Sequence, residues 1–196
     1  MTTKELIYHN ALKLFAQYGY TNVGMRELAK SVGIKASSIY NHYKSKEDIL
    51  MDIAQTLVNR MKEEVYPLFK QTHLEPRAFF TNISLSTNHF FEKDDIHELT
   101  SLLIPLEFLS EPLKELLHQE FIIKPRAAYT YYFNDLMKKG KMKETNPDLA
   151  AKLYHSFFVY HFYEKYLSKE SKGFMEKYEI LFKEHIDLFM TYFNIQ

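Results

Sequence analysis

Apolar residues recur at helical spacing along this chain, and few residues interrupt them. Between residues 6 and 18, steps of four, three, one and three place one stripe on a single face of an amphipathic helix: Ile7, Ala11, Leu14, Phe15 and Tyr18. The 196 residues include only 5 glycines and 6 prolines, too few for the turns of an all-β chain. We find no strand-length alternation of apolar and polar residues. The sequence therefore predicts an all-α fold.

Two short helices follow the first one. A helix over about 25–32 is broken by Gly33, and a third helix covers 35–43. Two short helices that are joined through a glycine turn and braced by a preceding helix form a helix-turn-helix. We expect the outer face of the third helix to be free to enter a major groove of DNA, with the second helix lying across the phosphates. Of the two tyrosines there, we expect Tyr43 to pack inward and Tyr40 to face outward.

The fourth predicted helix, residues 46–65, connects two predicted domains. Ser45 precedes it, and Asp48 stands three residues later as a capping-box partner. The N-terminal helix-turn-helix domain is expected to cover residues 1–46, and a second helical domain residues 47–196. Later helices are predicted at 76–92, 95–109, 111–138, 147–169 and 173–194, with Pro105 and Pro125 interrupting theirs.

Charge is balanced over the whole chain but not along it. The sequence has 25 basic and 25 acidic residues, yet between Arg26 and Lys46 five basic residues stand against the single acid Glu27. This excess of positive charge falls on the helix-turn-helix, where a surface facing phosphates needs it. Absence of cysteine excludes disulfides, thiolate metal sites and a cysteine nucleophile. There is no signal-peptide pattern and no apolar run of membrane-spanning length, so we expect a cytoplasmic protein.

Residues 7–50 resemble the DNA-binding domain of the TetR/AcrR family of bacterial repressors. The residues that carry the resemblance are Ile7, Ala11, Leu14-Phe15, Gly19-Tyr20, Arg26-Glu27-Leu28-Ala29, Val32-Gly33-Ile34, Ser38-Ile39-Tyr40-Asn41-His42-Tyr43 and Ser45-Lys46-Glu47-Asp48-Ile49-Leu50. One departure is that Val23-Gly24 stands where the family usually has a Ser or Thr cap for the second helix, so no side-chain oxygen is available there.

The resemblance implies roles for particular residues. The residues expected to contact DNA are Arg26, Lys35, Ser37, Ser38, Tyr40, Asn41, His42 and Lys46. Among these, Lys46 is expected to pair with a phosphate. Independent chemistry supports part of this set, because Asn can hydrogen-bond to adenine through two contacts and Lys can reach the acceptors of guanine.

In this family the C-terminal domain binds a ligand among its middle helices and dimerises through its last two helices. Candidates to line a pocket are Met61, Phe79, Phe80, Ile83, Phe90, Leu103, Phe108, Phe121 and Tyr129. Candidates for a homodimer interface are Tyr154, Phe157, Phe158, His161, Phe162, Phe182, Ile186, Phe189 and Met190. Because the pocket candidates are apolar, we expect a small apolar or aromatic effector, and no cofactor.

The sequence-based hypothesis is thus a ligand-responsive repressor that binds a palindromic operator as a dimer and is not an enzyme. Two alternatives stay open. The N-terminal helices could instead contact another protein, and the core aromatics could be only a core. A metal-dependent helical enzyme is the other alternative, since Asp94-x-x-His97 and Glu115-x-x-His118 resemble the carboxylate-histidine pairs of di-iron bundles.

Overall fold

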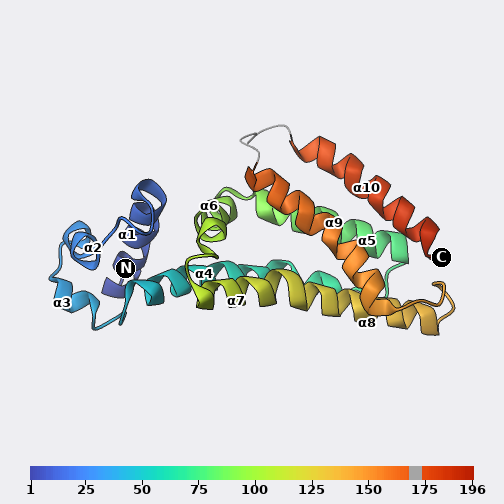
Figure 1. Cartoon of the computed structure of the whole chain (residues 1–196), viewed down its shortest axis with the longest axis horizontal. Coiled ribbons are helices and arrows are strands. Elements are labelled where there is room, and N and C mark those ends of the chain that lie inside the picture. Colours follow the sequence, from blue (N-terminus) through green and yellow to red (C-terminus); the bar gives the residue numbers. More distant parts are fainter. Residues whose placement is uncertain (168–173) are drawn as a thin grey trace. The chain divides into compact units, whose positions relative to one another are not determined.

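A computed structural model describes residues 1–167 and 174–196 of the chain, with side chains described for 1–165 and 178–196. Within these residues the protein is helical and has no β-strand (Figure 1). The elements are α1 (Thr3–Tyr18), α2 (Met25–Val32), α3 (Ala36–Ile39), α4 (Lys46–Glu64), the 3-10 helix η1 (Tyr66–Lys70), α5 (Pro76–Glu92), α6 (Asp94–Leu103), the 3-10 helix η2 (Ile104–Leu106), α7 (Glu111–His118), the π-helix η3 (Gln119–Ile123), α8 (Lys124–Lys138), α9 (Pro147–Leu167) and α10 (Phe174–Tyr192). No helix in the described part of the chain is long and apolar enough to cross a membrane.

The prolines divide the middle of the chain as predicted. The helix expected at 95–109 ends as α6 at Leu103, and Pro105 lies in the 3-10 turn η2. The helix expected at 111–138 contains the π-helix η3, and Pro125 lies in the first turn of α8, directly after η3. The predicted third helix is shorter than expected, since α3 ends at Ile39. The predicted helix ends at residues 169 and 173 lie outside the described residues.

The chain forms two compact units. Unit 1 consists of Met1–Arg60 and Asp94–Leu116, and unit 2 consists of Met61–Lys93 and Leu117–Gln196. The expected boundary at residues 46–47 differs from this division. Most of α4, together with α6 and α7, belongs to the unit that contains the helix-turn-helix.

Unit 1 buries one face of each of its first three helices. Ile7, Ala11 and Phe15 of α1 pack with Leu28 of α2 and Ile39 of α3, and each of them is at most 1% exposed. Val32 and Ile34, also expected in this core, are only partly buried. The first turn of α1 is held by Thr2 and Glu5, which bond to each other's backbone N–H in a capping box. The core fixes α2 and α3 and leaves their other faces outside.

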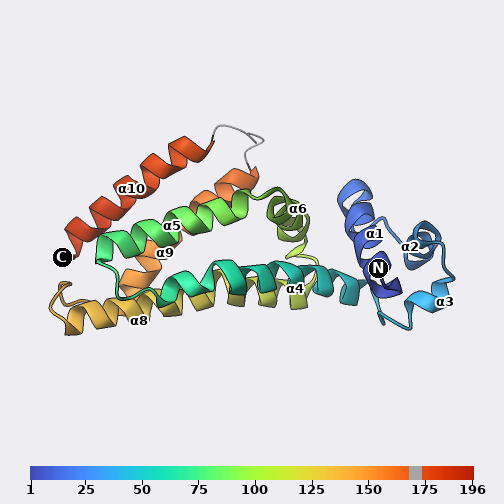
Figure 2. The same ribbon diagram turned by 180° about the vertical axis from the view of Figure 1, so that it is seen from behind.

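Unit 2 is built around aromatic side chains. α8 and α9 pack against each other, and α10 packs along α5 (Figures 1 and 2). The rings of Phe80, Phe133, Tyr154 and Phe189 contact one another at centroid separations of 4.9–6.3 Å. Such pairs add to the free energy of burying their apolar area. These rings form the core of unit 2, which joins α5, α8, α9 and α10.

Candidate functional site

The outer face of α2, α3 and the turn after α3 carries the residues predicted to contact DNA. Six of them have exposed side chains: Arg26, Lys35, Ser37, Tyr40, Asn41 and His42. A seventh, Ser38, is partly buried. Tyr40 is 53% exposed although it is a large aromatic residue. The structure therefore brings a cation, hydroxyls, an amide and an aromatic ring together on one solvent-facing surface, which we call the reading face.

Tyr43 points the other way, as predicted. It is 4% exposed, and its hydroxyl donates to Oδ2 of Asp52 on α4 at 2.6 Å. Lys4 Nζ lies 3.0 Å from the same carboxylate oxygen. Burial, with the Asp52 hydrogen bond and charge, raises the pKa of Tyr43. Burial raises the pKa of Asp52, but the contacts with Tyr43 and Lys4 outweigh it and the net pKa is lowered. This triad attaches the end of the reading face to α1 and α4.

The Lys46 side chain contacts other parts of the protein. Its Nζ donates to the backbone carbonyls of Tyr20 at 2.8 Å and Val23 at 3.0 Å, and it lies 4.4 Å from the centroid of the Tyr20 ring. These carbonyls belong to the turn between α1 and α2 and have no helical partners. Partial burial lowers the pKa of Lys46. Lys46 thus bonds to the turn before α2, and its contact with a phosphate stays a prediction.

The two helix starts differ as the sequence indicates. Ser45 Oγ accepts from the backbone N–H of Asp48 at 3.0 Å, and an Asp48 carboxylate oxygen accepts from the backbone N–H of Lys44 at 2.8 Å. Gly24, by contrast, caps α2 without a side-chain hydrogen bond. The start of α4 is thus well fixed and the start of α2 is held by backbone alone.

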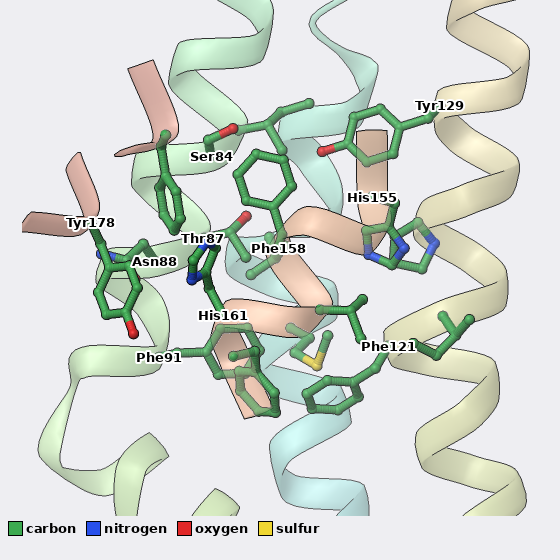
Figure 3. A pocket seen from close by; sticks show the side chains of 18 of the residues that line it. Ser84, Thr87, Asn88, Phe91, Phe121, Tyr129, His155, Phe158, His161 and Tyr178 are labelled. Atoms are coloured by element: carbon green, nitrogen blue, oxygen red, sulfur yellow. The ribbon is translucent and has the colours of Figure 1, made fainter. Parts of the chain in front are cut away.

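Unit 2 encloses a cavity between α5, α8 and α9 (Figure 3). The cavity has a volume of about 120 Å³. One water molecule needs roughly 10–15 Å³ of such volume. Among the predicted pocket residues, Met61, Ile83, Phe121 and Tyr129 line it. The cavity is therefore large enough for an organic molecule.

The other predicted pocket residues lie elsewhere. Phe79 and Phe80 are buried in the aromatic core of unit 2, and Phe90 is buried without lining this cavity. Leu103 and Phe108 belong to unit 1, where Leu103 is buried and Phe108 is 82% exposed. The physical reason is that helical spacing marks apolar residues without distinguishing a packed core from a cavity wall.

Sequence reasoning missed several wall residues. Thr87 and Phe91 follow Ile83 at steps of four on α5, so the spacing alone could have found them. His155 lines the cavity from α9, and it is 8% exposed. Phe158 and Phe162 also line it, although we had expected them at a dimer interface. The sequence marked Phe158 and Phe162 as apolar. Because α9 carries apolar residues around most of its circumference, the sequence did not show which of its faces points toward the cavity.

The predicted interface residues lie mostly inside the protomer. Five are at most 9% exposed: Tyr154, Phe182, Ile186, Phe189 and Met190. Phe157, Phe158, His161 and Phe162 are partly buried. The apolar residues that α9 and α10 do expose, each at least 50% accessible, are Leu149, Leu153, Tyr160, Ile180, Leu188 and Tyr192. These six residues are the large apolar side chains that the described parts of α9 and α10 expose to solvent.

The residues of the proposed di-iron pairs do not form a metal site in the described part of the chain. Asp94, His97, Glu115 and His118 are all exposed. Within the described residues, no group of three or more His, Cys, Asp or Glu side chains is placed to hold a metal ion.

Comparison with known proteins agrees with the N-terminal architecture. The family model described as bacterial regulatory proteins, tetR family, matches residues 7–53. The HTH-type transcriptional regulator YhgD of Bacillus subtilis is 28% identical over 153 residues, which is 76% of each chain. IcaR of Staphylococcus epidermidis, a negative transcriptional regulator of the biofilm operon icaADBC, is 38% identical over 56 residues, or 29% of this chain and 30% of IcaR.

Solved structures show the same fold over nearly the whole chain. SmeT of Stenotrophomonas maltophilia, the repressor of a multidrug efflux pump, matches with a TM-score of 0.73 and 14% identity over 100% of this chain and 92% of SmeT. SmeT has also been solved as a complex with triclosan. A TetR-family transcriptional regulator from Pseudomonas syringae matches with a TM-score of 0.69 and 16% identity, over 96% of this chain and 95% of that protein. These relatives are named as transcriptional regulators. The N-terminal part of the chain, residues 7–53, matches the tetR family of bacterial regulatory proteins, with the helix-turn-helix formed by α2 and α3.

Proposed function

We propose that the protein is a repressor that binds a palindromic operator as a homodimer and releases it when an uncharged apolar or aromatic effector fills the cavity of unit 2. The observation that carries the proposal is the reading face, which is exposed while the residues behind it are packed. The name of IcaR, as a negative regulator, and that of SmeT, as a repressor, support repression. The SmeT complex with triclosan supports an aromatic effector.

In this proposal two reading faces enter successive major grooves about 34–36 Å apart on one side of the duplex. Asn41 contacts base edges, and Lys35 and Arg26 pair with phosphates or guanine. The effector acts through α4, a continuous helix whose residue Met61 lines the cavity and whose first residue, Lys46, bonds to the turn before α2. A coupling of about 1–3 kcal/mol between effector and operator gives release of roughly 5- to 150-fold.

Base recognition by Asn41 is testable without knowing the operator. Bound sequences are selected from a random duplex library with wild type, Asn41→Ala and the control Asn134→Ala, which changes an exposed Asn of α8. We expect Asn41→Ala to relax the preference at one position of each half-site, by about 1–3 kcal/mol. Asn134→Ala should select the wild-type consensus. If wild type selects no consensus, or all three proteins select the same one, the assignment of the reading face is wrong.

The dimer is proposed to form through the exposed apolar residues of α9 and α10. Leu188 is 72% exposed on α10, and Leu188→Glu places a charge where the partner would cover it. The control Tyr131→Glu changes a residue of equal exposure on α8. In sedimentation equilibrium we expect wild type and the control to be dimers and Leu188→Glu to shift toward monomer and lose operator affinity. A dimer unaffected by Leu188→Glu contradicts this interface.

Release is tested with the selected operator and the aromatic probes described in the next subsection, at concentrations that saturate the cavity. We expect operator affinity to fall when the bound probe is present. Unchanged affinity at saturation removes the effector from the proposal and leaves DNA binding in place.

A further inference from the structure

The cavity holds polar atoms that have no hydrogen-bond partner. Thr87 Oγ1 and His155 Nδ1 are buried and lack partners among the described residues. The Tyr129 side chain is 3% exposed, and Figure 3 shows its oxygen at the inner end of the ring, directed away from α8. All three residues line the cavity. A buried polar group without a partner costs free energy, so the two unpaired atoms at this cavity need an explanation.

Lys165 and His161, two residues of the cavity wall, each lie beside an acidic side chain. Lys165 forms an ion pair with Glu92, and His161 Nδ1 lies 3.0 Å from Glu164 Oε2. Most of the remaining wall is apolar, with rings such as Phe91, Phe121 and Phe158. A charged ligand would lose its hydration in such a space, and the cation Lys165 that lines the wall already has an acidic partner.

We propose that the effector is an uncharged aromatic molecule with a hydroxyl-type polar group, and that Tyr129 is the specificity-determining residue that hydrogen-bonds to this group together with Thr87 and His155. This inference rests on the proposed function, because it names the class of effector that the repressor senses. The aromatic walls accept the rings of the ligand, and the three neutral polar groups select for its polar group.

The state of His155 agrees with an uncharged ligand. Burial, with a smaller contribution from the positive charge of Arg126, lowers the pKa of His155 to about 4, so its imidazole is neutral near pH 7. A neutral imidazole has one N–H donor and one acceptor nitrogen, and it can therefore meet a hydroxyl group as either partner. The imidazole itself offers no charge to an anion. Arg126 does not line the cavity, and its Nε is buried without a hydrogen-bond partner among the described residues. Its positive charge disfavours a cation, and the comparison of an anionic with a neutral probe below measures what it contributes to an anion.

α8 supplies a matched control three residues further on. Tyr132 is 1% exposed and its hydroxyl has no hydrogen-bond partner among the described residues, but Tyr132 does not line the cavity. Its ring lies 3.8 Å from that of Phe79, centroid to centroid, in the aromatic core. Tyr129→Phe and Tyr132→Phe thus remove the same atom from the same helix, one at the cavity and one away from it.

The experiment compares four probes with one ring system. Naphthalene is apolar, 2-naphthol adds a hydroxyl, 2-naphthoate is an anion and 2-naphthylmethylammonium is a cation. Dissociation constants are measured by calorimetric titration of the full-length protein without DNA, for wild type, Tyr129→Phe, Tyr132→Phe and Thr87→Val. Circular dichroism and melting temperature verify that each variant is folded.

We expect wild type to bind 2-naphthol about tenfold more tightly than naphthalene, a difference of about 1.4 kcal/mol, and to bind both ions more weakly than 2-naphthol. Tyr129→Phe should lose most of that preference through weaker binding of 2-naphthol, with naphthalene unchanged. Thr87→Val should lose part of it. Tyr132→Phe should bind all four probes like wild type.

Three outcomes overturn the inference: folded wild type binds none of the probes, an ion binds more tightly than 2-naphthol, or Tyr129→Phe binds 2-naphthol like wild type. Failure of the repressor proposal has a different signature. There the probe preferences appear as expected, while operator affinity stays the same at saturating 2-naphthol.

Discussion

Lys46 makes contacts within the protein that the sequence did not predict. Its position beside a helix start and its charge predicted a phosphate contact. In the structure its Nζ satisfies carbonyls 23 and 26 residues earlier in the chain. Such a contact depends on how α4 meets the turn before α2, which no local pattern encodes. Tyr40 and Tyr43 face outward and inward as predicted, although both lie beyond the end of α3 at Ile39 and not on a continued helix.

At this scale we predict that Lys46→Met destabilises the protein. The variant keeps most of the apolar stem but leaves the carbonyls of Tyr20 and Val23 without their charged donor, at a cost of about 1.5–3 kcal/mol. The measurement is the free energy of unfolding in urea. Lys44→Met is the control, because Lys44 is exposed. Equal stability of Lys46→Met and wild type would mean that the bonds from Lys46 to the turn add nothing to stability.

At the scale of elements, the sequence predicted the helices well where glycine, proline and caps mark their ends. Pro105 and Pro125 interrupt the chain as expected, and Ser45 with Asp48 caps α4. The faces of α9 were not predictable in the same way. This helix carries apolar residues nearly all round, so periodicity contained too little contrast to separate core, cavity wall and exposed surface.

The uncapped start of α2 gives a prediction for a whole element. Gly24 has φ −97° and ψ 160°, an extended conformation that serine adopts readily, and a Cβ there meets nothing within 4 Å. Gly24→Ser supplies the missing oxygen and reduces the freedom of the unfolded chain, so we expect stabilisation of about 0.5–1 kcal/mol. The melting temperature should rise. The contrasting variant Gly33→Ser, at φ 77°, should lower it because that conformation is strained without glycine.

For the molecule as a whole, buried histidines set a dependence of stability on pH. Burial lowers the pKa of both His155 and His185 from 6.5 to about 4, with Arg126 acting on His155 and His161 on His185 in the same direction. Between these values the unfolded chain binds more protons than the folded protein. The free energy of unfolding therefore falls as pH falls from about 6.5 toward 4.

The predicted slope is on the order of 1 kcal/mol per pH unit for His155, and smaller for the less buried His185. Urea unfolding at a series of pH values from 7 to 5 measures it. His155→Gln should reduce the slope, whereas His73→Gln, which changes an exposed histidine, should leave it as in wild type. A slope that is the same in all three proteins would mean that His155 is charged inside the folded protein.

The π-helix η3 has a consequence for how this chain can change in length. Hydrogen bonds from residue i to i+5 accommodate one residue more than the surrounding α-helical ladder. Deleting one residue within Gln119–Ile123 can convert the segment to α-helix and still leave α8 with the same face toward the cavity. Deleting one residue within Lys124–Ala128 would turn the helix by about 100° and carry the Tyr129 hydroxyl away from its ligand. Evolutionary insertions and deletions that preserve effector sensing should therefore collect in η3.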